Sequence, residues 1–190
     1  MILAHSNDTK LASSIDPTDH VRGPDTAIVT VVEYGDFECS ACGRAYGGVK
    51  TMLRRFRSDM RHVYRHFPQR EVHFHAEMAA EAAEVAAAQG KFWEMHDRLF
   101  ENQLHLKEKS LRTYADEIEL DLDRFDYELR EHVYLQRIQE HIDSGHRYEV
   151  RGTPTFFVNG ELVDVSFGIL PLEEAIVRCL GIQHGRLRSK

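Results

Sequence analysis

Two cysteines, Cys39 and Cys42, stand where an apolar, β-branched run gives way to a stretch that favours a helix. Residues 28–34 predict a strand in the middle of a sheet, and the helix after Cys39 is expected to continue to about residue 57. A Cys-x-x-Cys pair at a strand-to-helix junction is typical of a dithiol that opens and closes a disulfide. The pair therefore constrains both the fold around it and the chemistry it can perform.

The composition suits one folded domain, or one domain with a large insertion. The 190 residues are 42% hydrophobic and 29% charged, which is enough to bury a core without metal or disulfide staples. The formal net charge of −7 argues against nucleic acid as a partner, because phosphate binding needs a basic face. No apolar run approaches the roughly 18 residues of a membrane span, and no signal segment is visible. We expect a cytoplasmic protein, or a periplasmic or extracytoplasmic one whose export signal was removed.

Three further patterns predict an α/β fold around the first strand. Residues 61–67 alternate polar and apolar side chains, which indicates a second strand. Residues 155–165 predict a hairpin, because the dipeptide Asn159-Gly160 at its centre accepts positive φ at both positions. Residues 171–180 predict a short closing helix with proline in its first turn.

The stretch between the second strand and the hairpin differs in character. Residues 76–88 are rich in alanine and glutamate, and further helical patterns follow to about residue 148. We therefore predict a helical domain inserted into an α/β domain. The expected parts are a disordered arm over residues 1–15, an α/β domain over residues 16–68 and 149–190, and the inserted helical domain over residues 69–148.

The position of each cysteine in the helix predicts its task. Cys39 lies in the first turn, where backbone N–H groups and the positive end of the helix dipole favour the thiolate. Cys42 lies one turn inside the helix and is expected to be buried. We predict that Cys39 attacks a substrate disulfide and that Cys42 resolves the mixed disulfide. The dithiol carries the two electrons itself, so no cofactor other than the redox-active disulfide is expected.

Glu33 is a candidate proton acceptor. It lies six residues before Cys39, on the strand that leads into the helix. Its neighbours Val32 and Tyr34 are expected to face the other way, which would place Glu33 beneath the sulfurs, where it could accept the proton of Cys42. A glutamate in solvent at the edge of the sheet is an equal alternative on these residues alone.

A zinc site is an alternative role for the Cys39–Cys42 pair, and a third cysteine lies outside it. A Cys-x-x-Cys pair is half of a structural zinc site, but no second pair exists, and histidines would have to complete it. His62 and His66 are expected in a row on the outer face of a strand, while His73 and His75 lie at a helix start, so we expect no metal. The third cysteine, Cys179, is expected to be a buried thiol on the apolar face of the last helix.

The dithiol after a strand and Thr153-Pro154 before a hairpin resemble the thioredoxin superfamily. The helical block narrows the resemblance to the DsbA-like branch, and residues 73–76 and 89–96 are similar to segments of bacterial DsbA-type domains. The resemblance covers residues from about 16 to 182. It implies a thioredoxin fold with an inserted helical domain and the activity of a thiol–disulfide oxidoreductase.

The resemblance also implies residue roles and partners. Pro154 should follow a cis peptide bond and face the two sulfurs, and Thr153 should bind the backbone of an extended substrate peptide. Glu33 matches the buried acid of the family by position. The implied partners are cysteine-containing proteins or peptides and a thiol redox partner such as glutathione, the thioredoxin system or a membrane oxidase.

The dipeptide between the cysteines departs from the strongly oxidising members of the family. It is Ser40-Ala41 here, where those members carry proline and histidine, and Asp36 and Glu38 add negative charge nearby. Weaker stabilisation of the thiolate gives a more reducing couple. We therefore predict a reduction potential in the lower half of the range from about −120 to −270 mV.

Two alternative functions remain open at this point. One is a peptide-binding or chaperone-like module with a non-catalytic dithiol. The other is a glutathione-dependent transferase or isomerase of the same fold that acts on a small molecule. That branch usually shows a single serine or cysteine where this chain keeps a pair, so the intact pair favours an enzyme acting on protein disulfides.

Overall fold

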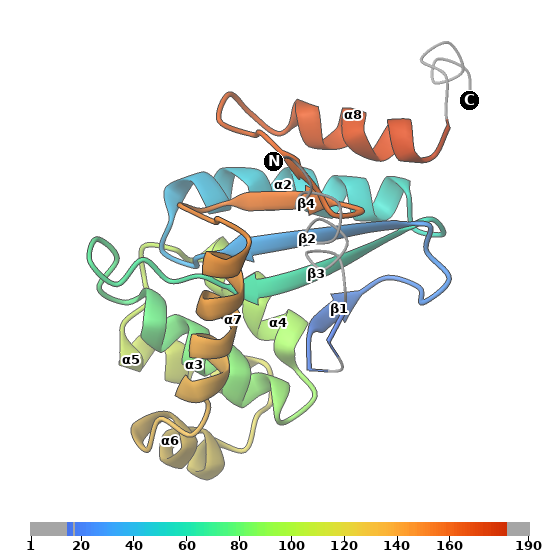
Figure 1. Ribbon diagram of the computed structural model, residues 1–190. Helices are drawn as coiled ribbons and strands as arrows, with labels where there is room; N and C mark the ends of the chain where they lie inside the picture. Colours follow the sequence, from blue (N-terminus) through green and yellow to red (C-terminus); the bar gives the residue numbers. More distant parts are fainter. Residues whose placement is uncertain (1–14, 17, 182–190) are drawn as a thin grey trace. The chain divides into compact units, whose positions relative to one another are not determined.

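The computed structural model describes residues 15–16 and 18–181 (Figure 1). The chain divides into two compact units, a sheet unit and a helical unit. In the described part, the sheet unit contains residues up to 34, residues 47–65 and residues from 155 onward, and the helical unit contains residues 35–46 and 66–154. The expected arm over residues 1–15 lies, except for its last residue, outside the described residues. The domain boundaries expected from composition stay a prediction.

The sheet unit is built on a five-stranded sheet with the order β1-β3-β2-β4-β5. The strands are β1 (His20–Arg22), β2 (Val29–Gly35), β3 (Met60–His66), β4 (Thr155–Val158) and β5 (Glu161–Val163). The pairs β1–β3, β2–β4 and β4–β5 are antiparallel. Strand β2 occupies the centre, and every one of its residues is buried, as the first apolar run predicted.

The predicted hairpin is present between β4 and β5. Asn159 and Gly160 have φ values of 49° and 90°, which are the positive angles that this turn requires. The side chain of Asn159 also ties the turn to the start of β2: its Oδ1 accepts from Thr30 N at 2.8 Å, and its Nδ2 donates to Ile28 O at 3.2 Å. The turn therefore fixes the register of the hairpin against the central strand.

The closing helix α8 (Leu170–Cys179) belongs to the sheet unit and corrects one expectation. Its buried residues include Leu172, Ala175 and Ile176, which share one face. Cys179 lies one turn beyond Ala175, yet it is exposed. It is the last residue of α8, so the prediction of a buried thiol was wrong, because the apolar face ends before the helix does.

The helical unit holds five helices between β3 and β4, as the composition predicted. They are α3 (Ala76–Ala87), α4 (Phe92–Glu101), α5 (Glu108–Glu117), α6 (Leu122–Arg130) and α7 (Leu135–Arg147). Helix α3 contacts all four others, and nine of its twelve residues are buried. Its many alanines allow this, because small side chains let neighbouring helices approach closely. The α/β fold with a helical insert is therefore present in the described chain.

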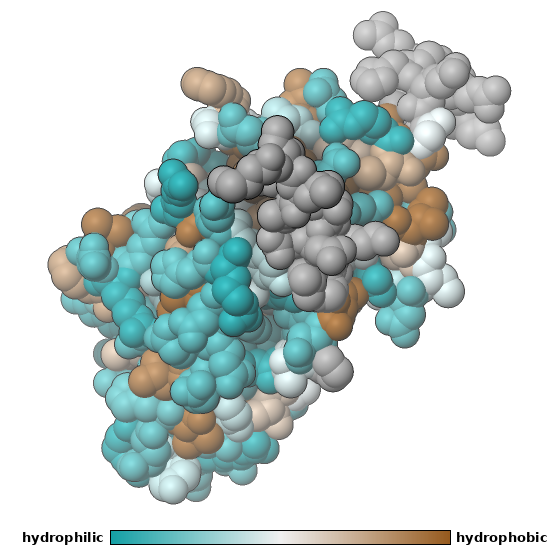
Figure 2. Space-filling model, in the orientation of Figure 1, coloured by the Kyte–Doolittle hydropathy of each residue, from teal (hydrophilic) through white to brown (hydrophobic). Residues whose placement is uncertain are grey.

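Helix α2 (Ser40–Arg55) follows β2 and carries the second cysteine of the motif. It begins in the helical unit and continues into the sheet unit. None of the helices in the described part of the chain is long and apolar enough to cross a membrane. Hydrophilic residues predominate on the face shown in Figure 2, and the hydrophobic ones are scattered among them.

Candidate active site

The two cysteines of the motif lie at the start of α2. Cys39 immediately precedes the helix, and its carbonyl oxygen accepts from Gly43 N at 3.1 Å, as in a first helical turn. Cys42 is fully buried, whereas 8% of Cys39 is exposed, and neither is in a disulfide. This confirms the expected burial of Cys42. It places the more accessible sulfur at the helix N-terminus.

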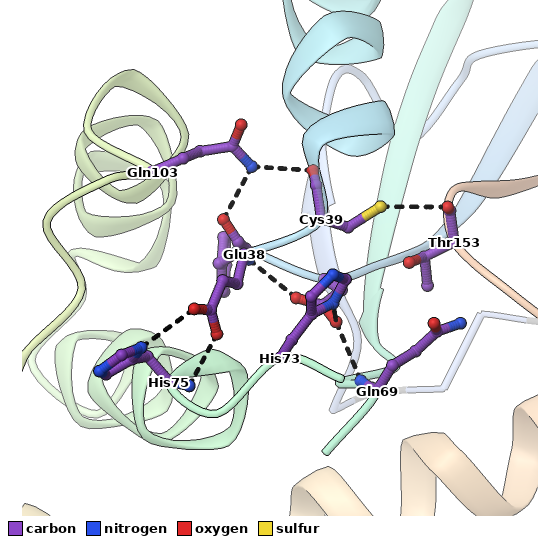
Figure 3. A network of polar contacts seen from close by, with 9 residues as sticks. Glu38, Cys39, Gln69, His73, His75, Gln103 and Thr153 are labelled. Carbon is purple, nitrogen blue, oxygen red and sulfur yellow. Dashed lines mark hydrogen bonds and ion pairs between the residues drawn. The ribbon is translucent and has the colours of Figure 1, made fainter. Parts of the chain in front are cut away.

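Gln103 supports the backbone of this segment, and no sequence pattern predicted this role. Its Nε2 donates to the carbonyl oxygens of Phe37 and Cys39 at 2.8 and 2.9 Å (Figure 3). Gly43 makes room for this side chain, because a Cβ atom at position 43 would lie 1.9 Å from Oε1 of Gln103. The side-chain amide of Gln103, a neutral donor, thus supports the start of α2 through hydrogen bonds to backbone carbonyls.

The Thr153-Pro154 peptide bond is cis, which confirms the expectation from the resemblance. Sγ of Cys39 donates to the carbonyl oxygen of Thr153 at 3.2 Å, so the loop before β4 reaches the reactive sulfur (Figure 3). The hydroxyl of Thr153 is buried and has no hydrogen-bond partner among the described residues. It is therefore an available donor for the sulfur once the thiol has lost its proton.

The pKa of Cys39 is lowered from 9.0 to about 5. The largest cause is a hydrogen bond from the Cys42 thiol; the Thr153 side chain and the backbone N–H groups of Cys42 and Ala41 also lower the pKa, while burial acts in the opposite direction. At pH 7 about 99% of Cys39 would be thiolate. The predicted advantage of the helix N-terminus is present, and the second cysteine adds to it.

Two carboxylates that precede Cys39 in the chain, those of Asp36 and Glu38, are each bound by a histidine from the loop before α3 (Figure 3). Nδ1 of His73 donates to Oδ2 of Asp36 at 2.8 Å. Nδ1 of His75 lies 3.0 Å from Oε1 of Glu38, and the backbone N–H of His75 donates to Oε2 at 2.7 Å. The sequence had presented these histidines as possible metal ligands; in the structure each binds a carboxylate.

Glu33 belongs to the sheet unit and is 3% exposed. Its Oε2 accepts from Nε2 of His62 at 2.9 Å, and His62 is itself buried. The alternative of a solvent-exposed glutamate is therefore wrong. The expectation that His62 and His66 lie on an outer face is wrong as well, because both are buried, as are nearly all residues of β3. The role of Glu33 towards Cys42 stays a prediction.

A family model described as thioredoxin matches residues 15–176. The chain belongs to the thioredoxin family. The family match and the solved structures below identify it as a DsbA-like thioredoxin domain, as the resemblance predicted.

Two solved structures are similar to this DsbA-like domain. BdbD from Bacillus subtilis is 22% identical with a TM-score of 0.76, covering 85% of this chain and 92% of that one. A thioredoxin-like oxidoreductase from Silicibacter pomeroyi is 27% identical with a TM-score of 0.76, covering 92% and 98%. The similarity to BdbD shows the fold. The similarity to the Silicibacter pomeroyi protein shows that a relative with this fold is described as an oxidoreductase.

The curated relatives are much longer than this chain. A protein of Salinispora arenicola named Na(+)/H(+) antiporter NhaA 1 is 49% identical over 163 residues, which make up 85% of this chain and 25% of the relative. A similar antiporter of Salinispora tropica is 48% identical over 164 residues. The DsbA-like domain thus spans about a quarter of the length of the curated relatives it matches.

Proposed function

We propose that this chain is a thiol–disulfide oxidoreductase that exchanges its Cys39–Cys42 dithiol with cysteines of protein substrates. The observation that carries the proposal is the environment of Cys39. Its pKa of about 5 makes it a thiolate at neutral pH, and its sulfur lies 3.2 Å from the carbonyl oxygen of Thr153, the residue before the cis proline. A nucleophilic sulfur beside a loop that can bind a peptide backbone suits exchange with a protein disulfide.

The reaction proceeds in two exchanges. The thiolate of Cys39 attacks one sulfur of the substrate disulfide, the substrate S–S bond breaks, and its other sulfur leaves as a thiolate that takes a proton from solvent. Cys42 then loses its proton and attacks Sγ of Cys39. The mixed disulfide breaks, the second substrate thiolate leaves, and the Cys39–Cys42 disulfide forms. The substrate gains two electrons from the dithiol, and the reverse sequence oxidises a substrate.

The other residues have supporting roles in this proposal. Thr153 and Pro154 bind the extended substrate backbone beside Cys39. Glu33 accepts the proton that Cys42 releases during resolution. Its burial and its place on the strand that leads directly to the dithiol support this role.

Trapping of the mixed disulfide tests the proposal. In a Cys42→Ser variant, attack by Cys39 can occur but resolution cannot, so a disulfide-containing peptide should accumulate as an adduct on Cys39, detectable by mass spectrometry. A Cys179→Ser variant is the matched control, because its thiol is exposed and outside the motif. It should turn over as the unmodified protein does. Absence of an adduct in the Cys42→Ser variant would leave a peptide-binding module with a non-catalytic dithiol as the better account.

The names of the curated relatives support a second proposal, which concerns the protein that this domain works with. The matched segment belongs to proteins named sodium–proton antiporters, so we propose that this domain works in association with such a transporter. Mixed disulfides trapped in cells by the Cys42→Ser variant should then include cysteine peptides of an antiporter. Trapping confined to unrelated proteins would contradict this. The cytoplasmic localisation expected from the sequence stays a prediction.

A further inference from the structure

Cys39 is preceded closely by two carboxylates, and both of them face histidines. Asp36 and Glu38 lie three residues and one residue before the reactive cysteine. Their charges would oppose formation of a thiolate, because like charges disfavour one another. The hydrogen bonds to His73 and His75, at 2.8 and 3.0 Å, place a potential cation on each of them (Figure 3).

Asp36 joins the reactive segment to the histidine loop. Its side chain is completely buried, and Oδ1 accepts from Glu38 N at 2.8 Å. Oδ2 accepts from Gln69 N at 2.9 Å as well as from His73. The carbonyl oxygen of Asp36 accepts from Cys39 N at 3.2 Å. One carboxylate therefore fixes both the turn that presents Cys39 and the loop that carries His73.

We propose that His73 and His75 are positioning residues that offset the charges of Asp36 and Glu38 and so stabilise the Cys39 thiolate, which makes the oxidising strength of the dithiol depend on the protonation of His73. This inference rests on the proposed function. The dipeptide Ser40-Ala41 carries no cation, and the inference is that the loop before α3 supplies one instead.

The electrostatics of His73 support the inference. Burial lowers the pKa of His73, but its hydrogen bond to Asp36 and the charges of Asp36, Cys39 and Glu38 raise it above 6.5 overall. The interaction is reciprocal, so a protonated His73 must also favour the Cys39 thiolate. Burial raises the pKa of Glu38, whereas the hydrogen bonds and charge of His75 and the charge of His73 lower it overall.

The sign of the pH dependence follows from these charges. With His73 protonated, the carboxylates of Asp36 and Glu38 and the thiolate of Cys39 lie near a cation. As pH rises through the raised pKa of His73, this cation is lost and the thiolate is less stabilised. The reduced form is then less favoured, and the couple becomes more reducing than proton release from the thiols alone would make it. The side chain of His73 is 23% exposed, so it can exchange its proton with solvent.

A His73→Asn variant separates charge from hydrogen bonding. The asparagine amide keeps a donor near the position of Nδ1 but carries no charge. We expect the pKa of Cys39 to rise by about one, with a tenfold shift of the glutathione equilibrium towards the disulfide form. The pKa is measured by the ultraviolet absorbance of the thiolate, and the equilibrium by mass spectrometry after alkylation. His75→Asn should act in the same direction, and the double variant should exceed either one.

His132→Asn is the matched control. Nδ1 of His132 binds Oε2 of Glu81 at 2.9 Å, but Glu81 lies on α3 rather than beside Cys39. This variant should leave the pKa of Cys39 unchanged. If His73→Asn matches His132→Asn within twofold, the histidines serve only to hold the loop and the inference is wrong. If the unmodified protein forms no dithiol–disulfide couple, the proposed function fails, whereas the effect of His73 on the pKa of Cys39 can still be measured.

A measurement on the unmodified protein covers the case in which the variants do not fold. Oxidation of the dithiol removes the Cys39 thiolate, so the pKa of His73, followed by NMR, should be higher in the reduced protein than in the oxidised protein. Equal values in the two states would overturn the inference.

Discussion

Two carboxylate–histidine pairs, one in each unit, differ in their access to solvent. Glu33 and His62 in the sheet unit lie 2.9 Å apart, and the His62 side chain is 2% exposed. Asp36 and His73 in the helical unit lie 2.8 Å apart, and the His73 side chain is 23% exposed. The bonds are nearly the same length, so distance does not distinguish the pairs. Burial makes the first pair a structural requirement, and solvent access lets the second respond to pH.

The largest expected effect is on the buried pair. A His62→Ala substitution leaves the Glu33 carboxylate buried without its partner, which should lower the free energy of unfolding by about 3–5 kcal/mol. Urea unfolding followed by circular dichroism measures this. A His62→Ala/Glu33→Gln double variant, which removes the unpaired charge, should recover part of the loss. A loss below about 1 kcal/mol for His62→Ala would show that the two pairs do not differ as described.

The second effect concerns the thiolate that the histidine loop surrounds. A folded-state pKa of about 5 against 9.0 for an ordinary thiol stabilises the folded, reduced protein by roughly 2–3 kcal/mol at pH 7. Because the folded-state pKa is depressed, this contribution is lost as pH falls through about 5. Unfolding of the reduced protein from pH 7 to pH 4 should therefore show a loss that a Cys39→Ser variant does not share. Parallel curves for the two proteins would contradict the low pKa.

The smallest effect is on the solvent-accessible pair itself. The folded-state pKa of His73 is raised, so the stability it contributes is present below pH 6.5 and is lost as pH rises through the raised pKa. For a partly exposed pair we expect about 0.5–1 kcal/mol. The unfolding midpoint of the oxidised protein should fall over this window and should do so less in His73→Asn. A fall of the same size in both proteins would assign the dependence to other groups.

Local patterns predicted the elements that short-range physics determines. The apolar run of β2 and the Asn159-Gly160 turn each depend on neighbouring residues, and both are present. The burial of Cys42 followed from its place one turn inside the helix that begins after Cys39. The cis bond before Pro154 came from the resemblance, because nothing in a Thr-Pro dipeptide itself selects the cis isomer.

The missed features depend on contacts between distant parts of the chain. His73 and His75 each bind a carboxylate 37 positions away, and Gln103 binds the carbonyl of Cys39 64 positions away. Periodicity gives the face of a helix but not the point where its neighbours end, so it misplaced Cys179. Alternation along β3 likewise suggested a solvent face for His62, whereas residues on both faces of this strand are buried.

The geometry around Cys39 bears on the expected reduction potential of the Cys39–Cys42 couple. The carboxylates of Asp36 and Glu38 were expected to disfavour the thiolate, yet each has a histidine partner. The pKa of about 5 lies between the values of about 7 for thioredoxin and about 3.5 for DsbA. A low pKa favours a less reducing couple than Ser40-Ala41 alone suggested, and a potential in the lower half of the family range stays a prediction.

The decisive measurement is the equilibrium of the Cys39–Cys42 couple with glutathione at pH 7, determined by mass spectrometry after alkylation. We predict one two-electron couple with a potential between about −120 and −270 mV. Failure of the two cysteines to form a disulfide at any ratio of oxidised to reduced glutathione would contradict it.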